Sequence, residues 1–315
     1  MTGRLLPEDP GRLQDLAATA SVTVAVSLAL LKLLASVLTG SLALLSSTVD
    51  SLADIVASSV TYLSVRVARQ PPDRSHRFGH GKAEALSALA QAALVLGAAL
   101  FILVEGVQRL LAPQPVRASG FGMLVVVVAI LVTSALLALQ RQVVARTGSQ
   151  AIAADAVHYR ADFLTNFATL LSLGLGRLEG WLWVDPAIAA LIALYLGWHA
   201  AAIGRRAVDV LMDRELPAEV RARILDLVRA DPEVRGVHDL RTRRAGRTVF
   251  IEMHVELDPE MTVRAAHDVA DALERRLAEV FPEAEIIVHQ EPAGIEDHRL
   301  DHVIAGLAGR RPTGM

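Results

Sequence analysis

The chain has 315 residues, of which 53% are hydrophobic and 4% aromatic, and it contains no cysteine. The lack of cysteine excludes disulfides, thiolate metal sites and cysteine nucleophiles. A formal net charge of −3 provides no strong field that would favour nucleic acid as a partner. The abundance of Ala, Leu and Val instead indicates packed membrane helices with small residues at their contacts.

Six apolar segments are each close to the ~20 residues that a helix needs to cross a bilayer. We expect these segments at 17–38, 42–65, 85–110, 120–140, 152–175 and 182–203. The short connection at Thr39-Gly40 predicts a tight hairpin between the first two. Arginine and lysine gather before the first segment and after the second, fourth and sixth, so the positive-inside rule places both termini in the cytoplasm.

Ionisable residues lie inside two of these segments. Asp50 and Asp54 are spaced i, i+4 in the second segment, and His158 and Asp162 have the same spacing in the fifth, so each pair shares a helix face. A charge at the bilayer centre costs roughly 2.5–3.5 kcal/mol on insertion scales, so these residues indicate a function. With a rise of about 1.5 Å per residue, antiparallel helices would bring Asp54 level with His158, and Asp50 level with Asp162.

These four residues, the membrane quartet, supply the three carboxylates and one imidazole of a divalent metal site. Two alternatives are that they only form hydrogen bonds inside the bundle, or that Asp50 pairs with Lys32. We interpret Asp155, near the cytoplasmic end of its segment, as a helix-charge residue or an entrance acid rather than a ligand. Four such ligands suit tetrahedral Zn²⁺, while Fe²⁺, Co²⁺, Ni²⁺, Cd²⁺ and Mn²⁺ stay open.

The loop PPDRSHRFGHGKAE follows the second segment and is kept non-helical by its prolines and glycines. Asp73, His76 and His80 could close on one ion there. On local spacing alone such a loop is more often simply solvated, but the neighbouring membrane quartet favours a second metal site.

From about Leu211 the composition becomes that of a soluble domain. Its patterns predict two helices, at 217–230 and 262–281, and three strands, at 234–246, 247–258 and 283–292. Gly246 marks the turn between the first two strands. This αββαβ order suggests an open-faced α+β sandwich of roughly 80 residues. We therefore expect a transmembrane domain at 1–210, the α+β domain at 211–292 and a flexible tail at 293–315.

The α+β domain carries four histidines and a nearby acid, namely His238, His254, His267, His289 and Glu291. His289 and Glu291 share one face of their strand, and His254 points away from the apolar residues of its own strand. Any one of these histidines could be a plain surface residue. Four of them with an acid in so small a domain favour a metal cluster, whereas we expect no specific role for His298 and His302 in the tail.

These patterns together resemble the cation diffusion facilitator family, in particular its bacterial zinc and ferrous-iron efflux branch. The resemblance covers residues 15–292 and is carried by DSLAD, HRFGHGKAEAL, HYRAD, LMDRELP, GVHDLRTR and IIVHQEP. It implies an all-α domain of six membrane helices and a cytoplasmic metallochaperone-like α+β domain. It also implies a homodimer in the bacterial inner membrane that exports a divalent cation, Zn²⁺ above all, in exchange for protons.

The resemblance further implies roles for individual residues. The membrane quartet would be the transport site, Asp73 with the two loop histidines a second site, and the five residues of the α+β domain a binuclear site that supports dimerisation. Lys82 and Asp213 match a charged pair that locks the dimer where the two domains meet. Glu291 stands where the best-known pattern has Asp, and a longer carboxylate can still bridge two metals.

Two other classes of protein fit less well. A non-transporting membrane metal sensor or assembly scaffold would have little use for charged groups inside its helices. An intramembrane metalloenzyme would need an open coordination position, and the sequence has no HExxH motif. Because the ligands bind metal only when deprotonated, protons and metal compete for the same groups, and this competition by itself gives an exchange cycle.

Overall fold

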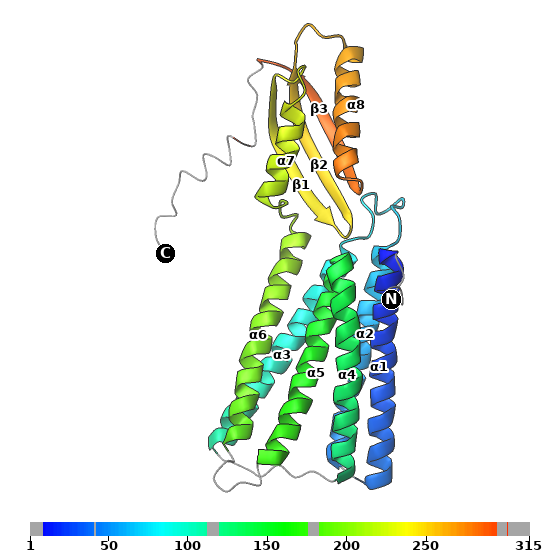
Figure 1. Cartoon of the computed structure of the whole chain (residues 1–315), viewed down its shortest axis with the longest axis vertical. Coiled ribbons are helices and arrows are strands. Elements are labelled where there is room, and N and C mark those ends of the chain that lie inside the picture. The colour runs from blue at the N-terminus through cyan, green and yellow to red at the C-terminus, as the bar shows by residue number, and fades with distance from the viewer. Residues whose placement is uncertain (1–8, 41, 112–119, 176–182, 295–300, 302–315) are drawn as a thin grey trace, which may run out of the picture. The chain divides into compact units, whose positions relative to one another are not determined.

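The computed structural model describes residues 9–40, 42–111, 120–175, 183–294 and 301. The chain divides into two compact units, Met1–Leu211 and Met212–Met315. The first unit is helical, and the second combines two helices with a sheet (Figure 1). His298, His302 and all of the expected tail except residues 293, 294 and 301 lie outside the described residues.

The described part of the first unit contains six helices. They are α1 (Pro10–Thr39), α2 (Leu42–Ala68), α3 (Ala83–Leu111), α4 (Gly120–Thr147), α5 (Gln150–Leu175) and α6 (Val184–Leu211). Each overlaps one predicted apolar segment. Most helices extend beyond the apolar segment into polar residues. This is because helical backbone hydrogen bonds do not require apolar side chains.

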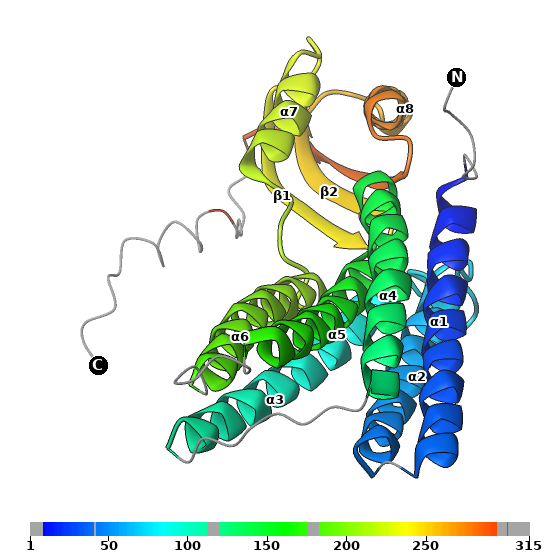
Figure 2. The same ribbon diagram turned by 60° about the horizontal axis from the view of Figure 1, so that its bottom comes forward.

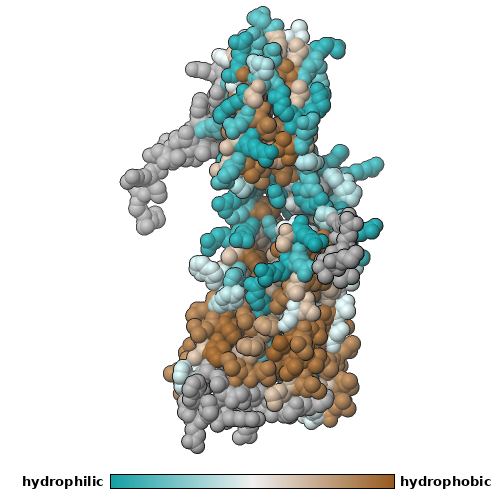
Figure 3. Space-filling model, viewed as in Figure 1, coloured by the Kyte–Doolittle hydropathy of each residue, from teal (hydrophilic) through white to brown (hydrophobic). Residues whose placement is uncertain are grey.

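Four of these helices, α1, α3, α4 and α6, are long and apolar enough to cross a membrane. Helices α2 and α5 hold the membrane quartet, whose ionisable side chains lower their apolarity. Large apolar side chains such as Leu34, Val37 and Phe101 are exposed on the helices. Figure 3 shows a broad apolar surface on the helical unit. So much exposed apolar surface is what a lipid-covered helical bundle requires.

Small residues bring the helices of the first unit together. Helix α3 packs along α6, and α1 lies beside α2 (Figures 1 and 2). Ala88, Ala154 and Ala207 form a buried cluster where α3, α5 and α6 meet, and side chains this small let backbones approach closely. Gly40 ends α1 with a φ of 66° and donates its N–H to Ser36 at 2.8 Å, a left-handed cap that favours glycine.

The second unit has the order α7 (Ala218–Arg229), β1 (Gly236–Ala245), β2 (Thr248–Leu257), α8 (Val263–Val280) and β3 (Ala284–Pro292). This is the αββαβ order that the sequence predicts. Strand β2 is central, antiparallel to β1 and parallel to β3. Gly246, with a φ of 62°, makes the tight turn between β1 and β2, and α8 is the crossover that a parallel pair requires.

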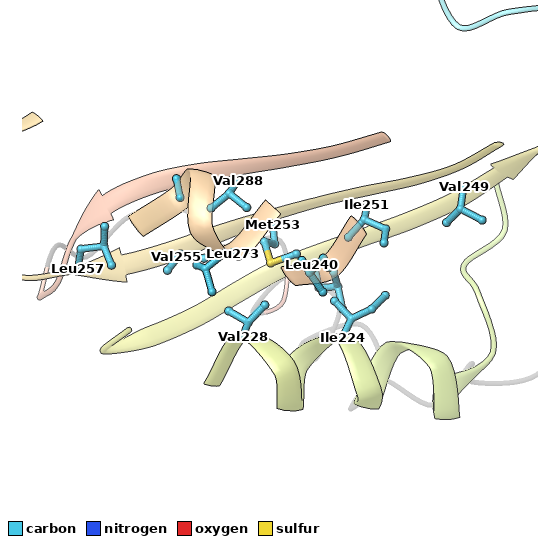
Figure 4. Packing of buried hydrophobic residues seen from close by; sticks show 12 residues of the cluster. Ile224, Val228, Leu240, Val249, Ile251, Met253, Val255, Leu257, Leu273 and Val288 are labelled. Atoms are coloured by element: carbon cyan, nitrogen blue, oxygen red, sulfur yellow. The ribbon is translucent and has the colours of Figure 1, made fainter. Parts of the chain in front are cut away.

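Both helices of the second unit pack on one face of its sheet. Apolar side chains on alternate positions of β2, including Ile251, Met253 and Val255, are almost completely buried. They meet Ile224 of α7 and Leu273 of α8 in a single core (Figure 4). Because strand side chains alternate between faces, the polar residues at the intervening positions lie on the opposite face.

Candidate metal sites

Helices α2 and α5 bring three ionisable side chains of the membrane quartet together. Nε2 of His158 lies 3.0 Å from Oδ1 of Asp54 and 3.9 Å from Oδ2 of Asp162. One potential ligand atom from each residue lies within 4.8 Å of the other two. All three side chains are partly buried. The i, i+4 spacing of His158 and Asp162 therefore does place both on the face of α5 that meets Asp54.

Asp50, expected as the fourth ligand, is not part of this cluster and is exposed on α2. The spacing of Asp50 and Asp54 predicts that they share a face of α2. It does not predict how much of that face meets α5, and the two helices make few contacts. Lys32, considered as a partner for Asp50, donates a hydrogen bond to Ser51 Oγ at 2.7 Å.

A buried polar layer lies beside the cluster. Asp155 is fully buried rather than accessible, and its Oδ2 accepts a hydrogen bond from Nε2 of Gln140 at 2.7 Å. The same Nε2 lies 3.0 Å from Oγ of Ser21. The hydroxyl of Tyr159 lies 2.8 Å from both Ser58 Oγ and the Ser21 carbonyl. These bonds link α1, α2, α4 and α5, so Asp155 is neither an entrance acid nor a first-turn helix charge.

Glu84 on α3 holds the N-terminal end of α5. Its Oε2 accepts hydrogen bonds from Ser149 Oγ at 2.5 Å and from the backbone N–H of Gln150 at 3.0 Å. Its Oε1 accepts from Nε2 of Gln14 on α1 at 3.2 Å. A carboxylate at a helix N-terminus satisfies N–H groups that have no partner inside the helix. The sequence shows only an acid in the first turn of α3, so this positioning role was not predicted.

The loop after α2 brings Asp73, His76 and His80 together. Nδ1 of His76 lies 3.5 Å from Asp73 Oδ1, and Nε2 of His80 lies 3.4 Å from Asp73 Oδ2. Oδ1 also accepts the backbone N–H groups of His76 at 2.6 Å and Ser75 at 2.7 Å. These two bonds, that of His76 first, hold the pKa of Asp73 below its usual value. An ionised carboxylate between two imidazoles is a donor set that fits a divalent transition metal.

Strand register builds the third cluster. His238 of β1 is the partner of His254 of β2, which in turn is the partner of His289 of β3. The rings form a row across the sheet, with centroids 5.2 Å and 4.8 Å apart. Glu291 lies two residues after His289 on the same face, and its carboxylate oxygens lie 2.5 Å from His254 Nδ1 and 3.1 Å from His238 Nε2.

The other residues around this cluster differ in position. His289 flanks it, with Nε2 3.5 Å from Oε1 of Glu291. His267 is not part of it: the side chain is exposed on α8, 4.0 Å from Asp271, because α8 packs on the opposite, apolar face of the sheet. Glu256, which was not predicted, lies 3.7 Å from Nε2 of His238. Its signal was its place two residues after His254, on the same strand face.

Lys82 and Asp213, the pair implied to lock the dimer, belong to different units. Nζ of Lys82 donates to the carbonyl of Leu211 at 3.4 Å. Asp213 lies 3.6 Å from the guanidinium of Arg243. The locking role of the pair stays a prediction.

Comparison with known proteins shows the family to which both units belong. The family model described as the cation efflux transmembrane domain matches residues 18–212, and that of the cation efflux protein cytoplasmic domain matches residues 216–293. The cation-efflux pump FieF of Shewanella oneidensis is 45% identical over 281 residues, 89% of this chain and 95% of that protein. FieF of Klebsiella pneumoniae is 44% identical over 285 residues, 90% of this chain and 95% of that protein.

Two of the similar solved structures each cover about a quarter of this chain. A zinc form of CzrB is 38% identical and covers 27% of this chain and 99% of that one, with a TM-score of 0.25. The metal-bound C-terminal domain of the CzcD transporter from Thermotoga maritima is 29% identical and covers 25% and 93%, with a TM-score of 0.24.

A helical membrane unit with ionisable clusters, joined to an α+β unit, defines a membrane cation efflux transporter. The two family models together match most of the chain. The chain belongs to the cation diffusion facilitator family, as its motifs indicated.

Proposed function

We propose that the protein is a homodimeric antiporter that exports Zn²⁺ across the bacterial inner membrane in exchange for protons. All six helices of the first unit would span the bilayer, with both termini in the cytoplasm. The observation that carries the proposal is the cluster of Asp54, His158 and Asp162 on helices α2 and α5. Ionisable groups inside membrane helices are costly, and such groups commonly line ion and proton pathways.

The donor chemistry supports Zn²⁺ as the transported ion. Zn²⁺ is a borderline cation and accepts both imidazole nitrogen and carboxylate oxygen in a four-coordinate site. Ca²⁺ takes six or more oxygen ligands, which this cluster does not supply. Asp50 lies outside the cluster in this structure and stays the proposed fourth ligand, one helical turn from Asp54. Fe²⁺, Co²⁺, Ni²⁺, Cd²⁺ and Mn²⁺ are alternative substrates for the same site.

The hydrogen bond between His158 and Asp54 supports proton exchange. Nε2 and Oδ1 face each other at 3.0 Å, so a proton shared between them would compete with an ion for the same two atoms. Metal loading therefore requires that this proton leave, and protonation from the other side of the membrane expels the ion. A rocking movement of the helices would expose the cluster to each side in turn.

The α+β unit is proposed as a cytoplasmic site for structural Zn²⁺ that favours the dimer. The two oxygens of Glu291 reach different histidines, His238 and His254, as a carboxylate bridging two ions would. His289 completes this set from the edge, and Glu256 adds an acid. His267 lies outside the cluster of its own chain and stays a proposed ligand of the dimer site. Asp73, His76 and His80 form the proposed loop site.

Zn²⁺ flux into proteoliposomes tests the proposal. Vesicles would contain a zinc-sensitive dye and a pH-sensitive dye, with the purified protein in the membrane. We expect Zn²⁺ uptake accompanied by proton movement in the opposite direction, and faster uptake when a pH gradient favours it. A correctly inserted protein that binds Zn²⁺ but moves neither ion would instead be a metal sensor or scaffold.

A further inference from the structure

The side chain of Asp155 is a buried acid that the metal cluster does not use. It is fully buried on α5, three positions before His158. Its Oδ2 accepts a hydrogen bond from Gln140, and the hydroxyl groups of Ser21 and Thr61 also lie beside the carboxyl group. Its Oδ1 is buried without a hydrogen-bond partner at normal distance. Across the described parts of both units, no cation forms an ion pair with it. Burial without a counter-charge favours the protonated form of a carboxyl group, because the ionised form would be uncompensated.

Gln140 can accompany either charge state of Asp155. Its Oε1 is also buried without a partner, and turning the amide by half a rotation exchanges its donor and acceptor ends. With the NH₂ group toward Asp155 it donates to a carboxylate, and with the oxygen toward Asp155 it accepts from a carboxylic acid. Ser21 Oγ, 3.0 Å away, is a hydroxyl that can donate or accept and can follow this turn.

The neighbours of Asp155 connect it to the metal cluster. On its own helix, His158 and Tyr159 follow by three and four positions and share its face. Helix α2 contributes Asp54, which is hydrogen bonded to His158. Helices α1 and α4 present a hydroxyl and an amide, and α3 and α6 meet this part of α5 through alanines. The positive charges that act on Asp155 would therefore be a protonated His158 or a divalent cation in the cluster.

We propose that Asp155 is a proton-binding residue of the transport cycle, separate from the metal ligands. The inference rests on the proposed exchange of metal for protons. A cation held by Asp54, His158 and Asp162 favours the ionised form of Asp155, and its departure favours the acid. The carboxyl O–H bond breaks as metal loads, and the proton passes to water on the side where the site is open. The O–H bond forms again after the metal leaves. Asp155 makes no bond to the metal at any stage.

The number of protons released per Zn²⁺ bound tests this assignment. The full chain would carry His76→Ala and His254→Ala, so that release reports on the membrane cluster, and a pH-sensitive dye would follow it in weakly buffered detergent solution. We expect Asp155→Asn to bind Zn²⁺ but to release fewer protons, with the difference approaching one per ion. Asp155→Glu should restore the count, which a purely structural effect would not do. Glu105→Gln, whose carboxylate pairs with Arg109 at 2.8 Å, is the matched control.

An Asp155→Asn variant that releases as many protons as the parent protein at every pH overturns the inference. If the parent protein itself releases none on binding Zn²⁺, the proposed exchange fails instead, so the two failures are distinguishable. Should Asp155→Asn not fold, infrared difference spectra of the parent protein and Asp155→Glu decide the matter. The assignment is supported if a protonated-carboxyl band disappears on Zn²⁺ addition and the frequency of that band differs in Asp155→Glu. It is contradicted if no such band is found or if its frequency is the same in both proteins.

Discussion

His158 and Asp54 are separated by 104 positions in the chain, yet their side chains meet at 3.0 Å. The contact joins α5 to α2 through the same two atoms that the proposed ion would bind. Any substitution that changes either atom should therefore affect metal transport more than folding.

Replacing Asp54 by Ala should abolish Zn²⁺ flux. The change removes one of three clustered ligands, and the described structure has no other carboxylate in the cluster except that of Asp162. Flux in proteoliposomes is the measurement, with size-exclusion chromatography to show that the variant is folded. Glu105→Gln removes a carboxylate of α3 outside the cluster and should transport normally. Wild-type flux in Asp54→Ala would remove the cluster from the transport site.

Replacing His158 by Asp should shift the metal preference toward harder ions such as Mn²⁺. An all-oxygen site suits harder cations than a site that contains an imidazole nitrogen. Competition between Zn²⁺ and Mn²⁺ in the same flux assay measures the shift. His199 on α6, whose ring lies 4.4 Å from that of Tyr195, supplies the control variant His199→Asp. A selectivity profile that does not change would mean that His158 is not a ligand.

The isolated segment 212–293 should dimerise more tightly with Zn²⁺ than without it. The unit has its own hydrophobic core, so we expect it to fold alone. At Zn²⁺ concentrations one hundred times the Kd, a metal that binds only the dimer would stabilise it by about 2.7 kcal/mol, roughly a hundredfold in the dimer constant. Analytical ultracentrifugation with and without chelator measures this effect.

Variants of one sheet face sharpen that measurement. Glu291→Ala should abolish the zinc effect, because Glu291 contacts two histidines, and Glu256→Ala should weaken it. Glu285 is an exposed acid on β3, outside the cluster, so Glu285→Ala should behave as wild type. Equal zinc effects in all three variants would show the histidine row to be an ordinary surface.

The carboxyl group of Asp73 should titrate below about pH 3.9, the ordinary value for aspartate. Its lowered pKa means that the two backbone hydrogen bonds stabilise the loop above that pH, and that this contribution is lost as the pH falls through the native pKa. Acidification from pH 7 to 5 should therefore leave these bonds intact. Carboxyl chemical shifts from NMR give the midpoint, and a midpoint at or above the ordinary value would contradict the loop geometry.

Ile251→Ala should lower the unfolding free energy of the isolated α+β unit by about 2–5 kcal/mol, the usual range for a buried Ile. Ile251 is fully buried at the centre of the sheet. Urea unfolding measures the difference. Ile287 on β3 is 54% exposed, so Ile287→Ala should change the stability far less. Similar losses in the two variants would argue against the core in Figure 4.

The sequence predicted the elements of both units well, because apolar length and strand alternation are local signals. It also predicted the pairing of Asp54 with His158, since helix rise converts sequence position into depth. It did not predict that Asp50 would lie outside the cluster or that Asp155 would be fully buried. Those outcomes depend on where α2, α4 and α5 touch, and spacing along one helix contains no such information.

The same limit applies to the α+β unit. Alternation along β2 identified the face of His254, but the strand register that aligns it with His238 and His289 is a property of three paired strands. His267 was grouped with the other histidines by composition, whereas the packing of α8 separates it from them. Glu256 could have been identified because residues two apart in a strand, such as His254 and Glu256, share one face.

The crossover through α8 has a consequence for the newly made protein. Because β3 pairs in parallel with β2 only after α8 has been made, His289 and Glu291 reach the sheet last. Pairing between distant segments is also slow compared with local helix formation. The helices of the first unit can thus be inserted before the histidine cluster of the α+β unit is complete. A chain truncated before β3 would keep the Asp54–His158 contact but lack the ligand cluster of the α+β unit.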